Sequence, residues 1–390
     1  MMRRWLGMAR WYARRRAGHG APWVLALVGL LALVSAVQPA AAQVSPTAPA
    51  SSPASPGQAV LRELTLEEAI ALAEQHNALI RQAEADLEDA RLALEETRAR
   101  NLMQPNPVLL LQAETGYELA RRNLVLTRSQ VRLSVEQAFY GVLRAENLTE
   151  VAREGVALAE RQLAVARDRV QAGAAAPVDV IRAESQLSSA RAGLLQAEGA
   201  VQLALLAFRQ TLGVGLDEPV RPASQPVEVE PIAIDLEADL AFALENRAEV
   251  LQARAGVEAA RKQVELTDND YTPGLSHERA RVGLKKAELA LQQVRDGITL
   301  EIRQLYQTLL DAERQVEVLE QAVAAAEETL RITEAMYEAG VATDLELLNA
   351  QTAFLQARTN HVNARFDHRE AQVRYAHAVA RALAESGYEQ

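Results

Sequence analysis

The sequence contains no cysteine, and only 4% of its 390 residues are aromatic. The absence of cysteine excludes disulfides, thiol nucleophiles and thiolate metal sites. Apolar residues make up 49% of the chain, and Ala, Leu and Val supply most of them. Together with the abundant Glu, Gln and Arg, this mixture is typical of long helices or coiled coils rather than of ordinary globular packing.

Catalytic patterns are also missing. The sequence has no Gly-rich phosphate loop, no nucleophile elbow and no paired catalytic constellation. Its many Asp and Glu residues lie on polar helical stretches, where such residues are usually solvated. We therefore expect no enzymatic activity and no cofactor.

Histidine is scarce, and two of the six histidines share one predicted helical stripe. His361 and His368 are seven residues apart, so they could face each other across subunits or bind a metal. A pair without a third ligand is weak support for a metal site. The alternative is that both are partly hydrated seam positions, and we expect no metal site.

The N-terminus has the pattern of an export signal. Six arginines precede the apolar run "PWVLALVGLLALVSAV", and Ala40 and Ala42 fit a small-x-small cleavage site. We expect residues 1–42 to be a cleaved signal peptide, the alternative being a retained membrane anchor. Removing them changes the net charge from −11 to −17, because they hold six Arg and no acid. So acidic a chain is a poor candidate for binding nucleic acid or anionic lipid.

The remaining chain divides into two similar halves. Residues 43–64 are a Pro/Ser-rich linker, 65–213 a first helical repeat, 214–234 a Pro-rich connector, and 235–385 a second helical repeat. "LEEAIALAEQHN" at Leu66 matches "LEADLAFALENR" at Leu236 with an offset of 170, and Phe139 matches Tyr306 with an offset of 167. The chain is a tandem duplication of one helical unit.

Each half carries a long heptad seam. Steps of three and four from Val135 meet mostly apolar residues as far as Gly173, and the same steps from Ile302 reach Gly340. Seams of matching pattern follow in 180–208 and 347–375, where large residues alternate with Ala. A repeat of 3.5 residues sustained this long needs a partner helix and a left-handed supercoil.

The two seams of each half are joined by similar turns. "VQAGAAAPVDVIRAE" in the first half matches "YEAGVATDLELLNAQ" in the second. Gly173 and Gly340 are placed to end a helix in the left-handed conformation. Pro177 suits the first turn of the next helix, and Asp344 suits a cap. This predicts two antiparallel helical hairpins.

The expected fold is therefore all-α, with long antiparallel coiled-coil hairpins. Arms from about Gly116 and Ser276 to the turns would be on the order of 85–95 Å long at 1.5 Å per residue. Such lengths indicate a stalk, a filament or a tube.

This ordered pattern resembles the TolC family of outer-membrane efflux channels over nearly the whole mature chain. The resemblance rests on the duplication, the two entry helices and the two turns "AGAAAPVDVIRAESQL" and "AGVATDLELLNAQTAF". The segment "QPNPVLLL" resembles the subgroup associated with metal and cation efflux.

The resemblance implies a homotrimer whose helices form a tunnel, in an exported protein of the outer membrane or periplasm. It implies a passive exit duct in a tripartite efflux or type I secretion system, coupled through a periplasmic adaptor protein to an inner-membrane RND or ABC pump. The adaptor would dock on the hairpin tips, which are Gly173, Ala174, Ala175, Gly340, Val341 and Ala342.

The resemblance also implies a constriction near these tips. Asp179 and Glu346 match acidic residues of the family's gate, and a ring of carboxylates would attract cations. Asn349 stands where the family often has a further acid, and Ala342 where some members have a basic residue that helps to close the gate. Alternatively, Asp179 and Glu346 only complement the positive end of a helix.

The sequence departs from the family pattern at the opposite ends of the hairpins. Family members insert two β-strands there in each repeat, and each membrane strand needs about 9–11 residues. Residues 101–115 leave room for one strand, "PVLLLQAE", and "NDYTPGLSHERAR" for none. We therefore expect little or no β-barrel and favour a loss of these pairs of β-strands. The alternatives are a tube that abuts a membrane and a rearrangement of the short ends.

The rival function is a non-channel periplasmic spacer or scaffold built from coiled coils. The same heptads would serve it, so they do not separate the two functions. The duplication with two equivalent tips favours the tube.

Overall fold

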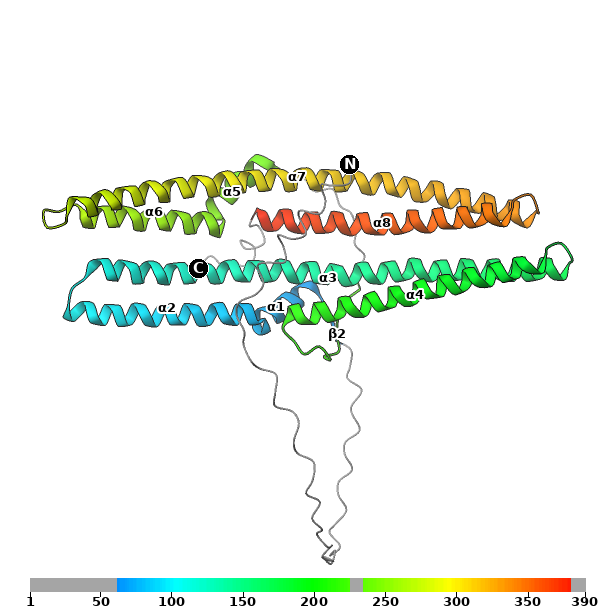
Figure 1. Cartoon of the computed structure of the whole chain (residues 1–390), viewed down its shortest axis with the longest axis horizontal. Helices are drawn as coiled ribbons and strands as arrows, with labels where there is room; N and C mark the ends of the chain where they lie inside the picture. Colours follow the sequence, from blue (N-terminus) through cyan, green and yellow to red (C-terminus); the bar gives the residue numbers. More distant parts are fainter. Residues whose placement is uncertain (1–61, 225–233, 380–390) are drawn as a thin grey trace, which may run out of the picture. The chain divides into compact units, whose positions relative to one another are not determined.

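The computed structural model describes residues 62–224 and 234–379 (Figure 1). The predicted signal peptide, most of the linker and part of the connector lie outside these residues. The described residues form eight helices and two short strands, which confirms the expected all-α fold. No helix within these ranges combines the length and hydropathy that a membrane span requires.

The two repeats have matching elements. The first comprises α1 (Leu66–His76), α2 (Ala78–Met103), α3 (Pro107–Gln171) and α4 (Pro177–Leu212). The second comprises α5 (Leu236–Asn246), α6 (Ala248–Thr267), α7 (Gly274–Glu338) and α8 (Asp344–Ala378). Both α3 and α7 have 65 residues, and at 1.5 Å per residue each is about 98 Å long. α7 begins and ends 167 residues after α3, so the duplication is kept over the whole of both helices.

The long helices begin earlier than their heptads predict. α3 starts at Pro107 rather than near Gly116, so "PVLLLQAE" is helical and does not form the one strand it had room for. The reason is local: the Asn106 side chain accepts a hydrogen bond from the Leu109 backbone N–H at 3.1 Å. Pro107 follows it at the first helical position, where its missing N–H costs nothing.

The two short strands join the start of the first repeat to the connector. β1 (Arg62–Leu64) pairs in parallel with β2 (Val220–Pro222), with Glu63 opposite Arg221. The Thr65 cap follows β1 directly, and Thr65 and Glu68 form a capping box. The entry of the first repeat is thereby fixed beside the end of α4.

One residue interrupts the first helix of each repeat. Asn77 separates α1 from α2, and its side chain donates to the Thr211 carbonyl at the end of α4 (2.8 Å). Arg247 separates α5 from α6 and donates to the Ala378 carbonyl at the end of α8 (3.3 Å). Thr211 and Ala378 are 167 residues apart, so both repeats close with the same contact through different side chains.

An aromatic pair marks the centre of each repeat. Phe139 and Phe208 meet edge to face with ring centroids 6.1 Å apart, and Tyr306 and Tyr375 meet at 6.3 Å in the second repeat. The Tyr375 hydroxyl donates to Asp239 at 2.8 Å, whose side chain is buried. The second repeat thus gives its buried hydroxyl a carboxylate partner, as burial of a polar group requires.

The heptad seams pack within the chain. Ala159 is buried against α4, in a cluster with Leu163, Ala166, Ala183 and Leu187. Ala326 lies in the corresponding α7–α8 cluster. Each hairpin therefore uses its seam to pair its own two helices.

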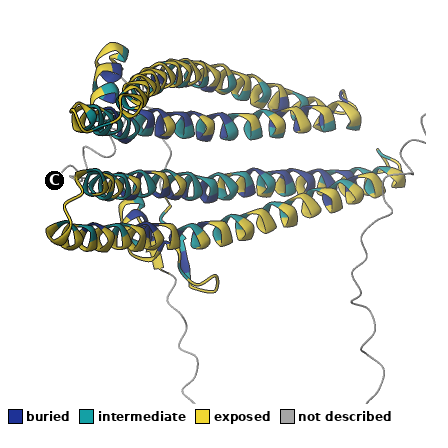
Figure 2. Ribbon diagram, turned by 60° about the vertical axis from the view of Figure 1, so that its left-hand side comes forward, coloured by how far each residue is buried: buried dark blue, intermediate teal, exposed yellow. Residues whose placement is uncertain are grey.

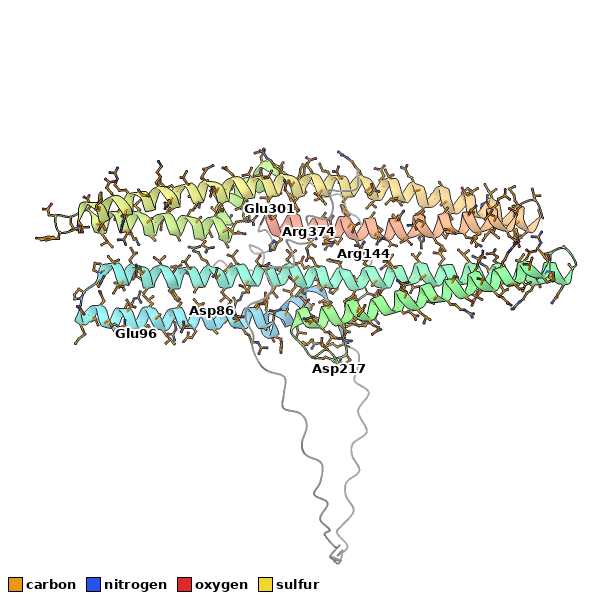
Figure 3. All side chains as sticks on the ribbon, viewed as in Figure 1. Asp86, Glu96, Arg144, Asp217, Glu301 and Arg374 are labelled. Carbon is orange, nitrogen blue, oxygen red and sulfur yellow. The ribbon has the colours of Figure 1, made fainter. Side chains whose placement is uncertain are left out.

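The hairpins lie side by side through α3 and α8. Arg144, labelled in Figure 3, lies on α3 and donates to Asn363 and Asp367 on α8, both at 2.9 Å. Toward the tips, the contacts give the helix order α4–α3–α8–α7. Toward the opposite ends of α3 and α7, they give the order α2–α3–α6–α7. Exposed positions dominate α4 (Figure 2). The helices therefore form a layer that is four helices wide at both ends, with α7 along one edge and α4 and α2 along the other.

Candidate functional site

The first tip is a helix end with a left-handed glycine. Gly173 has φ 72°, and Ala174 N–H donates to the Arg169 carbonyl (2.8 Å) while Gly173 N–H donates to Val170 (3.0 Å). This is the Schellman pattern, which satisfies the last helical carbonyls. Pro177 then begins α4, as the sequence predicts.

The second tip repeats this geometry. Gly340 has φ 76°, and Val341 N–H donates to Met336 at 2.8 Å while Gly340 N–H donates to Tyr337 at 2.9 Å. The cap of α8 is Thr343, however, and not the predicted Asp344. The Thr343 hydroxyl is one residue earlier, where it can accept from the N–H of the third helical residue.

The two predicted gate carboxylates each close a helix N-terminus. Asp179 accepts from the Ala176 N–H (3.1 Å) and lies 3.4 Å from Arg182. Glu346 accepts from the Thr343 N–H (2.7 Å) and hydroxyl (2.8 Å). These bonds to Thr343 lower the pKa of Glu346. The capping role proposed for both acids is thus present, and the second carboxylate oxygen of Asp179 accepts from Arg182.

The remaining predicted tip residues differ in exposure. Asn349 lies one turn into α8 and is exposed. Val341 is exposed, whereas Ala342 is buried beneath the second turn. The first turn, from Gly173 to Ala176, is mostly exposed. The two tips therefore present similar backbones but different side-chain surfaces.

One tip residue was missed by the sequence analysis. The guanidinium of Arg169 on α3 lies 4.6 Å from the ring centroid of Tyr337 on α7, so it joins the two hairpins. Burial and the Asp344 carboxylate raise the pKa of Tyr337, although Arg169 acts in the opposite direction. The signal that could have found the contact is the tyrosine at the last seam position before Gly340, because an aromatic ring there can receive a cation.

The histidine pair lies far along α8 from the tip. His368 is buried, and His361 is half-buried. His368 helps to line a cavity of about 130 Å³ with Tyr306 and Glu313. In the described parts of the chain, no three His, Asp or Glu side chains gather as metal ligands would.

The two edges of the four-helix layer carry exposed apolar side chains. On α4 these are Val178, Ile181, Leu195, Leu203 and Leu206, and on α7 Leu275, Val282, Leu289, Leu300, Val318, Ile332 and Met336. On α7 the intervals between them are 7, 7, 11, 18, 14 and 4 residues, all close to whole helical turns. One stripe of apolar residues therefore follows the length of α7, and such stripes are typical of a face that packs on another helix.

Comparison with known proteins connects this arrangement to one family. The family model described as "Outer membrane efflux protein" matches residues 106–214 and 276–381, which is more than half of the chain. Protein CyaE of Bordetella pertussis is 28% identical over 306 residues, covering 63% of this chain and 64% of that protein. Outer membrane protein TolC of Vibrio cholerae is 24% identical (66% and 67% covered). The cobalt-zinc-cadmium resistance protein CzcC of Cupriavidus metallidurans is 26% identical (64% and 68% covered).

The fold agrees with these matches. The crystal structure of the outer membrane protein VceC from Vibrio cholerae aligns with a TM-score of 0.67 at 18% identity, covering 80% of this chain and 95% of VceC. The chain spans about two thirds of the length of the curated relatives. The chain therefore belongs to the outer membrane efflux protein family, which confirms both the resemblance to TolC and the expected location in the outer membrane or cell envelope.

Proposed function

We propose that the chain is a trimeric exit duct through which small molecules or metal ions leave the cell. The family is one of efflux proteins and not of enzymes. The observation that carries the proposal is the four-helix layer, whose two edges, α7 on one side and α4 with α2 on the other, are exposed and partly apolar. When one edge of a subunit packs on the other edge of the next subunit, the contact is heterologous. Such contacts close into a ring if the rotation from one subunit to the next permits it. Three copies would place twelve helices around a central space.

The tips fit the docking of a periplasmic adaptor. Each copy has two reversals of the same backbone geometry, Gly173 and Gly340 both lying in the left-handed region. Three copies would present six similar tips, a match for an adaptor of threefold or sixfold symmetry. Through the adaptor, an inner-membrane RND or ABC pump would supply the energy, and the duct itself would be passive.

The gate proposal rests on the first turns of α4 and α8. Asp179 and Glu346 occupy equivalent positions of the two hairpins, and each accepts a hydrogen bond from the backbone N–H of the residue that precedes its helix. Six such carboxylates around an axis would favour cations over anions. Similarity to CzcC, whose name gives cobalt, zinc and cadmium resistance, supports metal ions as the cargo of this chain.

A periplasmic spacer without a channel is the second candidate. The α3–α4 and α7–α8 seams would serve it equally well. A spacer of this kind would leave the apolar stripe on α7 exposed to water, whereas a ring of copies would cover it.

The proposal is tested at the edge of the layer. Leu195→Glu with Leu203→Glu places two charges on α4 and should convert the trimer to a monomer of unchanged helical content, as measured by light scattering and circular dichroism. Ala157→Glu with Ala353→Glu adds the same charges at exposed positions of α3 and α8, and this control should remain trimeric. A wild-type chain that is monomeric at micromolar concentration, or an α4 variant that stays trimeric, would contradict the ring.

A further inference from the structure

The internal duplication shows which face of α7 lacks a neighbour in a single chain. Away from the tips, α3 packs on both α2 and α6, whereas α7, its equivalent in the second repeat, has only α6 along this part of its length. Glu118 and Leu119 on α3 are half-buried. The equivalent residues on α7, Lys285 and Lys286, are exposed, and we call them the lysine pair. The lysine pair therefore lies on the side of α7 that a further helix would cover.

The same comparison identifies an open face on α2. Its equivalent α6 packs on α3, and Gly256 and Ala259 of α6 are half-buried. The residues of α2 at these positions, at the offset of 170, are Asp86 and Asp89, and both are exposed. We call them the aspartate pair, and Asp86 is labelled on α2 in Figure 3. In a ring of copies, the α3–α6 contact within a chain has its counterpart between α7 of one copy and α2 of the next.

The α3–α6 contact within the chain also gives the level at which these faces would meet. Arg247, the residue before α6, donates to the Ala378 carbonyl, and the ring of the adjacent His377 lies 2.8 Å from the Ser129 hydroxyl on α3. The start of α6 is therefore level with Ser129. From there α6 runs toward the reversal opposite the tips, in the direction opposite to α3.

Counting along both helices from this level brings the equivalent positions together. Gly256 is nine residues along α6 and Leu119 is ten residues back along α3, which is about 14 Å and about 15 Å at 1.5 Å per residue. Leu119 and Gly256 thus lie at the same level within the chain. Their equivalents, Lys286 of one copy and Asp86 of the next, would meet in the same way.

The two open faces carry opposite charge. Residues 279–286 of α7 hold four basic side chains and no acid, and residues 84–89 of α2 hold four acids and no basic side chain. The lysine pair and Lys262 are the only lysines in the sequence. Among the residues that the structure describes, neither the lysine pair nor the aspartate pair makes an ion pair or a side-chain hydrogen bond. Both pairs are therefore free to bind a partner of opposite charge.

We propose that the lysine pair of each copy forms ion pairs with the aspartate pair of the next copy, and that these ion pairs fix the partner and the register of the contact between copies. The inference rests on the proposed trimer and adds to it the residues that select the contact. Charges beside a packed helical seam set partner choice and orientation. Glu118 takes the place of Lys285 on α3, so α3 would meet the aspartate pair with like charge. The ion pairs thus favour α7 over α3 as the neighbour of α2 from the next copy.

Carbodiimide coupling tests the contact directly, because it joins a lysine amine to a carboxylate without a spacer. The described residues lie in the unit formed by residues 58–390, so residues 43–390 retain the whole fold. Coupling of this chain should give covalent dimers and trimers in which the lysine pair is joined to the aspartate pair. Lys285→Arg/Lys286→Arg keeps the charges and removes the amines, so the trimer should remain and the coupling between chains should be lost. Lys262→Arg is the control and should leave that coupling unchanged.

Charge reversal gives an independent measurement. Lys285→Glu/Lys286→Glu should raise the concentration at which half of the protein is trimeric at least about tenfold at low salt, with unchanged helical content. Adding Asp86→Lys/Asp89→Lys to the same chain exchanges the two charges and should bring that concentration back to within about threefold of the wild-type value. Light scattering and circular dichroism measure both properties.

A matched control changes the same charges on another face. Lys262→Glu/Arg279→Glu alters two cations whose positions are exposed in both repeats, the equivalents being Leu92 and Gln112. This variant should form trimers at the same concentration as the wild type.

Three results would overturn the proposal. One is coupling between chains that persists in Lys285→Arg/Lys286→Arg. Another is a Lys285→Glu/Lys286→Glu variant that forms trimers as readily as the wild type. The third is an exchange of charges that restores nothing. In all three the wild type is still a trimer, so the ion pairs fail and the ring stands. A monomeric wild type would contradict the ring itself and the ion pairs with it.

Discussion

At the scale of single residues, three glycines share one backbone conformation but have different surroundings. Gly173, Gly213 and Gly340 have φ between 72° and 77°. A Cβ at Gly213 would lie 2.5 Å from the His76 carbonyl oxygen, whereas a Cβ at Gly173 would meet nothing within 4 Å. Gly213 is therefore required by a close approach of two backbones, and Gly173 by its dihedral angle alone.

This difference predicts unequal costs for the same substitution. Gly173→Ala should lower the free energy of unfolding by about 1–2 kcal/mol, the cost of a left-handed alanine. Gly213→Ala should cost at least about 3 kcal/mol, because the backbone must also move away from His76. Urea unfolding of both variants checks the order, and equal costs would mean that α4 and the α1–α2 break are not packed as described.

His377 gives the fold a dependence on pH. Burial lowers its pKa, with Arg247 acting in the same direction and Glu249 and Glu301 against it. Its ring nitrogen is 2.8 Å from the Ser129 hydroxyl, across the contact between α8 and α3. Burial also lowers the pKa of His361 and His368.

A histidine whose folded pKa is lowered stabilises the fold above its unfolded pKa of about 6.5. The unfolded chain binds more protons below that value, so this stability is lost as the pH falls toward the folded pKa. The free energy of unfolding should therefore decrease between about pH 7 and about pH 5. His377→Gln should make that dependence shallower, and His76→Gln, at an exposed position, should not. An unchanged pH profile in His377→Gln would exclude this role.

At the scale of elements, the heptad seams hold each hairpin together. Ala159 faces α4 in a tight cluster, so Ala159→Leu should overpack the seam and lower the free energy of unfolding by about 1–3 kcal/mol. Ala157→Leu on the exposed face of α3 is the control and should change it by less than about 0.5 kcal/mol. Thermal unfolding measures both, and a harmless Ala159→Leu would argue against close pairing of α3 with α4.

The tips are joined across hairpins by Arg169 and Tyr337. Arg169→Ala removes a cation–π contact of about 0.5–1 kcal/mol, so amide exchange in residues 337–346 should become two- to fivefold faster. Arg167→Ala removes an exposed ion pair with Glu184 within the first hairpin and should leave that exchange unchanged. Hydrogen exchange by mass spectrometry separates the two cases, and identical profiles would show that Arg169 does not restrain the second tip.

Patterns local in sequence predicted most of these elements. The heptads, Gly173 and Gly340 sufficed for the hairpins, because seam period and helix ends are set by neighbouring residues. The true start of α3 was missed, since Asn106 and Pro107 open the helix nine residues before the expected Gly116. Arg169 and Arg247 were also missed, because their partners are distant in sequence and nothing in the local pattern identifies them.

At the scale of the whole molecule, three features combine. The duplication supplies two hairpins that pack through α3 and α8, the edges α4 and α7 remain apolar and exposed, and the tips repeat one geometry. A single chain leaves the edge stripes exposed to water, and a closed ring covers them. The family to which the chain belongs is consistent with a channel made in this way.

The most direct test of the channel is electron microscopy of residues 43–390, purified without detergent. We predict a hollow cylinder with threefold symmetry and walls one helix layer thick, with six tips at one mouth. A solid rod, or a monomeric bundle at the same concentration, would contradict the duct and leave the periplasmic spacer as the better description.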